Sequence, residues 1–122
     1  MSEEPMVQLS GEEKEELCLK LASHLPRIRE LLNVTQKEFG ELVGLSTPRI
    51  SVIENGKFTM TWAQFTSILF ICACNMRTKE YVYANEILTG KLLQYLQRKD
   101  DNIPPMVNIT VNVEMLDQYR TV

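Results

Sequence analysis

The chain has 122 residues, of which 44% are hydrophobic and 24% charged, which is the length and composition of one globular domain. It contains no apolar run of about 18 residues, and this excludes a membrane-spanning helix. Its N-terminus lacks the basic start and the apolar stretch of a signal peptide, so we expect a cytoplasmic protein.

The net charge of −3 at pH 7 is concentrated near the N-terminus. Residues 1–23 hold six glutamates against two lysines, whereas residues 24–60 hold five basic and four acidic side chains. Because the middle of the chain is faintly basic, a nucleic-acid partner is not excluded, but its non-specific binding should be weak.

A first helix is predicted to begin near Gly11, because Ser10 and Glu13 have the spacing of a capping box. Its apolar positions recur at helical spacing, at Leu17, Leu21, Leu25 and Ile28. Pro26 interrupts this run and disfavours helical geometry at the residue before it. The sequence therefore predicts either a kink at Pro26 or a new helix that begins near Ser23.

A second capping box, Thr35 with Glu38, opens a short helix over residues 36–43. Asn33 can adopt the left-handed conformation that ends the preceding helix. Gly44 stops the short helix. The first predicted helix and the short helix over residues 36–43 are thus separated by only a few residues.

Ser46 is a good N-cap, and Pro48 is tolerated in a first helical turn, so a third helix is predicted over residues 47–54. Asn55-Gly56 then forms a strong turn. Two short helices that meet at a glycine have the architecture of a helix-turn-helix.

Two further helices follow. Thr61 and Gln64 cap an apolar helix over residues 62–74. A longer helix starts at Thr78 and runs to Leu96, and Gly90 weakens its middle, so the helix is a candidate to break there.

Beyond a linker at residues 100–105, the hydrophobic period changes to that of a half-buried strand. The alternating apolar residues are Val107, Ile109, Val111, Val113 and Met115. A lone strand cannot satisfy its own backbone groups, so we expect it to pair with the same segment of a second molecule in a twofold-symmetric dimer. The alternatives are that the tail is disordered in isolation or adds to the sheet of another protein.

The central segment resembles the Cro/repressor-like (Xre-type) helix-turn-helix family over residues 24–74. The matching residues are Thr35, Gln36, Lys37, Glu38, Phe39, Gly40, Val43, Gly44, Leu45, Ser46, Ile50, Ile53, Glu54, Asn55, Gly56 and Lys57. The resemblance implies a mostly α, five-helix domain, to which the residue patterns add an extra N-terminal helix and a single C-terminal β-strand. Its expected division is an acidic extension at 1–22, the helix-turn-helix domain at 23–99, and a linker with the dimerisation strand at 100–122.

Within this resemblance, a small residue at Gly40 lets the two helices cross closely, and Gly44 gives the turn its backbone freedom. Arg29 and Glu54 fall where the family has a buried salt bridge. The apolar set expected to hold the helix pair against its neighbours is Phe39, Leu42, Leu45, Ile50 and Ile53.

The resemblance also implies double-stranded DNA as the partner, with the third helix in the major groove. The positions that match DNA-contacting residues or lie beside them are Gln36, Ser46, Thr47, Pro48, Arg49, Ser51, Val52, Asn55 and Lys57. Arg49 is the best candidate to read a guanine, and Gln36 resembles a phosphate anchor. Because Pro48 and Val52 lack the amides of better-studied readers, base readout should be sparse or depend on DNA shape.

An enzyme is not expected. His24 is the only histidine, and nothing resembles a nucleophile with its base. Cys72 and Cys74 are better explained as core filling than as metal ligands, and the three cysteines suit a reducing compartment, so no metal and no cofactor are expected. The sequence therefore predicts a DNA-binding transcriptional regulator, a repressor that binds a palindromic operator as a homodimer. The alternative is a protein-interaction module, such as an antitoxin-like partner that uses the C-terminal strand.

Overall fold

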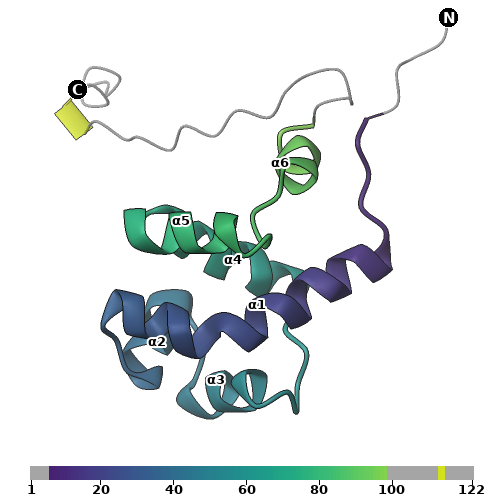
Figure 1. Ribbon diagram of the computed structural model, residues 1–122. Helices are drawn as coiled ribbons and strands as arrows, with labels where there is room; N and C mark the ends of the chain where they lie inside the picture. Colours follow the sequence, from purple (N-terminus) through teal and green to yellow (C-terminus); the bar gives the residue numbers. More distant parts are fainter. Residues whose placement is uncertain (1–5, 99–112, 115–122) are drawn as a thin grey trace, which may run out of the picture.

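The computed structural model describes residues 6–98 and 113–114, and six helices form within the first of these stretches (Figure 1). The helices are α1 (Gly11–Leu32), α2 (Gln36–Val43), α3 (Thr47–Glu54), α4 (Trp62–Ala73), α5 (Met76–Ala84) and α6 (Gly90–Leu96). The mostly helical fold that the sequence predicts is confirmed. No helix among the described residues is both long enough and apolar enough to span a membrane.

Local hydrogen bonds set where the helices begin. The three predicted capping boxes, which start at Ser10, Thr35 and Thr61, all form: each hydroxyl accepts from the backbone N–H three residues on, and that residue's side chain accepts from the cap's own N–H. Such reciprocal bonds satisfy two backbone donors that would otherwise lack a partner at a helix start.

The long helix α1 is continuous through Pro26. The alternative of a new helix near Ser23 is therefore wrong, and the boundary expected between residues 22 and 23 falls inside this helix. Pro26 has no N–H to donate to the preceding turn, and its ring is exposed. The residues that α1 buries lie on both sides of the proline: Cys18, Leu21, Ala22, Leu25 and Ile28. Because one core holds both halves in register, packing outweighs the local cost of the proline.

The helix predicted over residues 78–96, with Gly90 as a candidate for a break, is two helices, α5 and α6. The chain turns between them at residues 85–89, where Glu86 has a positive φ of 59°. The Thr89 hydroxyl then caps α6 by accepting from the backbone N–H of Leu92. The break therefore comes just before Gly90, which is the first residue of the second helix.

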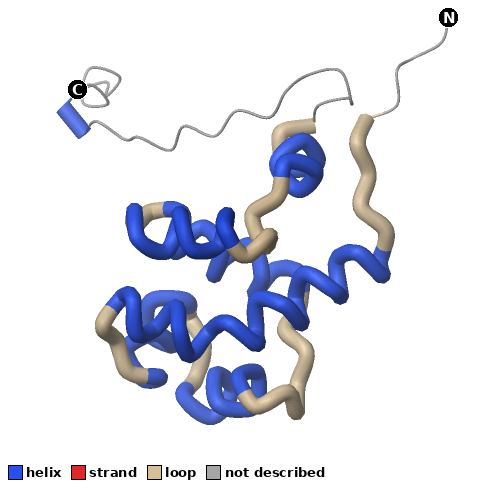
Figure 2. The backbone as a smooth tube through the Cα atoms, viewed as in Figure 1, coloured by secondary structure: helices blue, strands red, loops and turns tan. Residues whose placement is uncertain are grey.

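The helices enclose one hydrophobic core, and α1 packs against α3, α4 and α5. Figure 2 shows α1 crossing the molecule, with α3 on one side of it and α5 and α6 on the other. The largest fully buried side chains are Phe39, Phe65, Leu21, Leu25, Ile28, Ile50, Ile53, Ile68, Ile87, Leu92, Val82 and Thr78. Side chains from α2 and α3 are among them, so the core fixes the helix-turn-helix to the rest of the domain.

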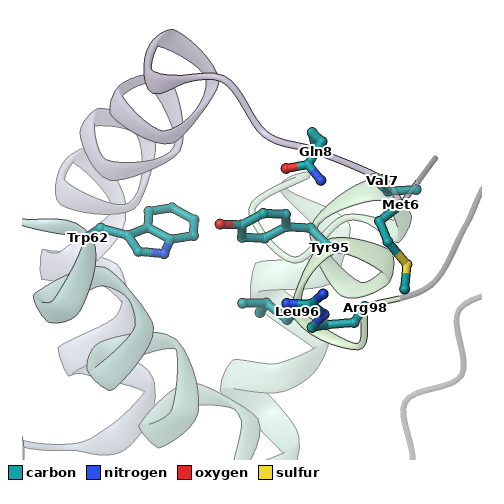
Figure 3. Close-up of a pocket in the computed structure, with 7 residues that line it drawn as sticks. All are labelled: Met6, Val7, Gln8, Trp62, Tyr95, Leu96 and Arg98. Carbon is teal, nitrogen blue, oxygen red and sulfur yellow. The ribbon is translucent and has the colours of Figure 1, made fainter.

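Away from α3, residues 6–8, the first residue of α4 and the C-terminal end of α6 line an open pocket of about 360 Å³ (Figure 3). Trp62 and Tyr95 lie in its wall at 6.4 Å between ring centroids, and the Lys14 ammonium lies over both rings. Trp62 also stacks on Phe65, so this tryptophan packs within the domain.

The predicted strand falls almost wholly outside the described residues. Val107, Ile109, Val111 and Met115 are outside them, and the fifth member, Val113, is helical together with Glu114. Within the part of the chain that the structure describes there is no β-strand, so the C-terminal strand stays a prediction.

Candidate nucleic-acid interface

The two helices of the helix-turn-helix meet at Gly40 on α2. A Cβ atom placed on this residue would lie 2.3 Å from the backbone carbonyl oxygen of Leu45, far inside contact distance. The Gly40 carbonyl also accepts a hydrogen bond from the Leu45 N–H at 2.8 Å. Between them Gly44 has a φ of 76°, which side-chain-bearing residues rarely adopt. Both glycines are therefore required by the turn itself.

Apolar packing against the core fixes α2 and α3 in place. Phe39, Ile50 and Ile53 are fully buried, and Leu45 is half-buried against them. The expectation that Leu42 belongs to this set is wrong, since its side chain is 51% exposed. Leu42 lies one helical turn from Phe39 but on the outward side of α2.

A charged network joins three helices behind the interface. Arg29 on α1 donates to both carboxylate oxygens of Glu54 on α3, with Nε–Oε2 at 2.6 Å and Nη2–Oε1 at 2.9 Å. Gln36 at the start of α2 donates its amide N–H to the same Oε1 at 3.1 Å. The Glu54 side chain is only 8% exposed and that of Arg29 19%, and their hydrogen bonds raise the pKa of the arginine. This network sets how α2 and α3 lie against α1.

The first turn of α3 is open to solvent. Ser46 caps the helix by accepting from the Arg49 N–H at 3.2 Å, while Thr47 and Pro48 are exposed. Pro48 has no N–H, and at this position in a helix none is needed. This edge is free to approach another molecule.

The remaining α3 residues of the predicted set are less accessible. Ser51 and Val52 are half-buried, and the Val52 carbonyl accepts from the backbone N–H groups of Lys57 and Phe58. Beyond the helix, Asn55 and Lys57 are exposed, and the Asn55 side-chain oxygen accepts from the Lys57 N–H at 3.3 Å. Asn55 thus shapes the turn that presents Lys57.

One contact at the candidate interface was not predicted from the sequence. The Arg49 guanidinium carbon lies 3.9 Å from the centroid of the Phe58 ring, which is a stacking distance. The only sequence signal would have been an aromatic residue just after the Asn55-Gly56 turn, close to where the chain returns past α3. The dimerisation residues, by contrast, are outside the described part of the chain except for Val113.

The family model described as helix-turn-helix matches residues 27–60, which run from the second half of α1 through α3 to the loop before α4. This segment is a helix-turn-helix of the Cro/repressor-like (Xre-type) family, as the sequence predicts. Members are DNA-binding regulators and are typically not enzymes. No curated protein and no solved structure matches the chain.

Proposed function

We propose that this protein is a sequence-specific transcriptional regulator, a repressor that acts in the cytoplasm by occupying a palindromic operator as a homodimer. The observation that carries the proposal is the exposed first turn of α3, with Thr47 and Pro48 accessible and Arg49 beside them. The C-terminal end of α3 is fixed to α1 through the bond between Glu54 and Arg29, while its N-terminal turn is free. A recognition helix needs such a free N-terminal turn in order to enter a major groove.

Contacts to bases and to phosphates divide along α3. Arg49 presents a fork that fits guanine O6 and N7, and the methyl groups of Thr47 and Val52 suit a thymine methyl. Pro48 contributes shape only. The residues assigned to phosphates or to the edges of the site are Gln36, Ser46, Ser51, Asn55 and Lys57. The second N–H of the Gln36 amide remains available for a phosphate while the first binds Glu54.

The dimer is supported by an apolar groove between α4 and α6. It is lined by Thr66, Leu69, Phe70, Ala73, Leu88, Leu93 and Leu96. At its rim Phe70 is 61% exposed and Leu96 44%, which is unfavourable for large apolar side chains in a monomer. Together with the predicted strand, whose members outside the described residues are Val107, Ile109, Val111 and Met115, this groove would form a twofold interface.

Selection of bound duplexes from a random pool tests the proposal directly. We expect one enriched sequence with twofold symmetry and half-sites about one helical turn apart. Affinity for the selected duplex should fall with salt at a log–log slope of about −0.9 per phosphate contacted. Enrichment of nothing, or of a site without symmetry, would contradict the regulator or the dimer, respectively.

Single substitutions locate the interface. Arg49→Ala and Gln36→Ala should each weaken binding to the selected duplex by roughly 10-fold or more. Arg77→Ala is the matched control, because Arg77 is an exposed arginine on α5, outside the helix-turn-helix. Equal loss from the control would mean that charge alone, and not α3, binds the duplex.

A protein-interaction module is the second candidate, and the exposed Phe70 at the apolar groove favours it. In that case the groove and the C-terminal segment would bind a different protein, as an antitoxin binds its partner. The salt titration separates the two, since a module of this kind shows no binding to duplex at any salt concentration.

A further inference from the structure

Arg49 differs from the other arginines of the helix-turn-helix in what holds it. Arg29 donates two hydrogen bonds to Glu54, and Arg27 donates one to Glu30. The Arg49 guanidinium lies instead over the ring of Phe58, with its central carbon 3.9 Å from the ring centroid. Among the residues that the structure describes, its N–H groups have no hydrogen-bond acceptor. Stacking fixes the plane of the guanidinium while leaving its donors unused.

Phe58 reaches this position because the chain folds back over α3. Gly56 takes a φ of 79°, and the carbonyl of Val52 then accepts from the Lys57 N–H at 2.9 Å and from the Phe58 N–H at 3.1 Å. The Phe58 ring also packs against the hydrophobic core. The backbone hydrogen bonds and the core packing together hold the Phe58 ring in one place beside Arg49.

We propose that Phe58 is a positioning residue, which orients Arg49 to read a guanine in the operator. This inference rests on the proposed function. An arginine that is free in solution must order several side-chain torsions when it binds a base, and that ordering reduces affinity. An arginine already stacked on an aromatic ring has lost much of that freedom before binding, and its donor edge points at the same place in each molecule.

Lys57 and the pair of Phe58 and Arg49 have different roles at the interface. Lys57 follows the turn and supplies charge, so it should strengthen binding to every duplex alike. The pair of Phe58 and Arg49 should strengthen binding only where a guanine stands in the right place. Although Phe58 carries no charge and no hydrogen-bonding group, it is therefore expected to affect sequence preference.

A double-mutant cycle tests this. The variants are Arg49→Ala, Phe58→Leu and the two combined, and each is titrated with the duplex selected by the unaltered protein. We expect Arg49→Ala to weaken binding roughly 10- to 100-fold and Phe58→Leu about 3- to 10-fold. In the Arg49→Ala background, Phe58→Leu should change affinity less than about twofold, because its effect acts through Arg49.

Three control measurements accompany the cycle. Phe58→Tyr keeps the ring and should retain the affinity of the unaltered protein, which separates stacking from mere size. Thermal unfolding of each variant shows whether Phe58→Leu leaves the domain folded at the assay temperature. Affinity for a random duplex should be nearly unchanged in Phe58→Leu, because no charge is lost.

The proposal is overturned if Phe58→Leu weakens binding equally with and without Arg49, or if selection with Phe58→Leu returns the same guanine preference at undiminished strength. It is also overturned if Arg49→Ala weakens all sequences alike and lowers the salt slope, which would make Arg49 a phosphate contact. Failure of the proposed function gives a different result, namely that the unaltered protein enriches no duplex at all.

Discussion

At the scale of single residues, the carboxylate of Glu54 accepts three side-chain hydrogen bonds from two other helices. Its carboxylate binds Arg29 from α1 and Gln36 from α2 while it sits at the end of α3. With 8% of the side chain exposed, the carboxylate depends on these donors in place of water. A buried charge that loses its partner is strongly destabilising, whereas a solvated one is not.

Arg29→Met should therefore lower the free energy of unfolding by about 3 kcal/mol, because it leaves Glu54 without its cation. The control is Arg27→Met. Arg27 pairs with Glu30 at 2.9 Å, but both side chains are more than half exposed, so its loss should cost less than about 1 kcal/mol. Urea denaturation of the two variants measures the difference. Equal costs would show that the Arg29 pair is no better shielded than the surface pair.

The cysteines give a second prediction at this scale. Burial raises the pKa of the Cys72 thiol to about 12, and it also raises the pKa of Cys18, whereas Cys74 is exposed. Only the thiolate reacts with a disulfide reagent, so at pH 8 the folded protein should show one fast thiol. Cys74→Ser should remove that phase, and denaturant should release the slow thiols. A second fast thiol in the folded protein would mean that α1 opens locally at Cys18 or that α4 opens locally at Cys72.

At the scale of elements, local signals predicted where α1, α2 and α4 begin and where α1 and α2 end, whereas packing decided where a helix continues and where the chain turns. The capping boxes at Ser10, Thr35 and Thr61 depend on neighbours three residues away, so the sequence alone reveals them. The continuity of α1 through Pro26 depends on a core made by other helices, which no local pattern contains. The turn at residues 85–89 depends likewise on the burial of Ile87 and Leu88.

The candidate site divides in the same way. The spacing of Gly40, Gly44 and Glu54 predicted the helix-turn-helix because each is required within the motif itself. The stacking of Phe58 on Arg49 could not be predicted, because it depends on the path of the loop in three dimensions. Leu42 was misplaced since a helix of eight residues shows too few turns to tell its buried face from its exposed one.

The close crossing of α2 and the α2–α3 turn at Gly40 can be tested by substitution. Alanine is the better helix former by about 1 kcal/mol, so Gly40→Ala should stabilise α2 if nothing lies nearby. Here the added methyl would meet the Leu45 carbonyl, and we expect a net loss of about 1–2 kcal/mol instead. Gly11→Ala is the matched control, since that glycine is also helical and has nothing within 4 Å. Thermal unfolding of both variants decides, and a stabilised Gly40→Ala would show that the helices can separate at little cost.

At the scale of the whole molecule, the interface carries little charge for a DNA binder. The net charge is −3, and the cations on or beside the exposed edge of α2 and α3 are Lys37, Arg49 and Lys57. Few phosphate contacts per chain imply weak binding by one copy, because counterion release supplies most non-specific affinity. A dimer doubles the number of phosphate contacts although the charge of each chain is unchanged. The proposed function therefore depends on a dimer.

A chain ending at Asp101 tests that dependence. Among the residues that the structure describes, the buried core runs from Val7 to Leu92, so the shortened protein should keep its fold. If the C-terminal segment pairs two copies, sedimentation equilibrium should show the full chain as a dimer and the shortened chain as a monomer. Affinity for the selected palindrome should then fall by at least 100-fold, while affinity for a single half-site stays the same.

The apolar groove is tested beside it with the full-length chain. Phe70→Glu places a charge at the groove rim, and Tyr83→Glu is the control, because that side chain is 67% exposed on α5 and outside the groove. Only the first should shift mass toward the monomer, since burying an unpaired carboxylate opposes association. If Asp101 truncation and Phe70→Glu both leave a dimer, neither the tail nor the groove is its interface, and the twofold operator would need another explanation.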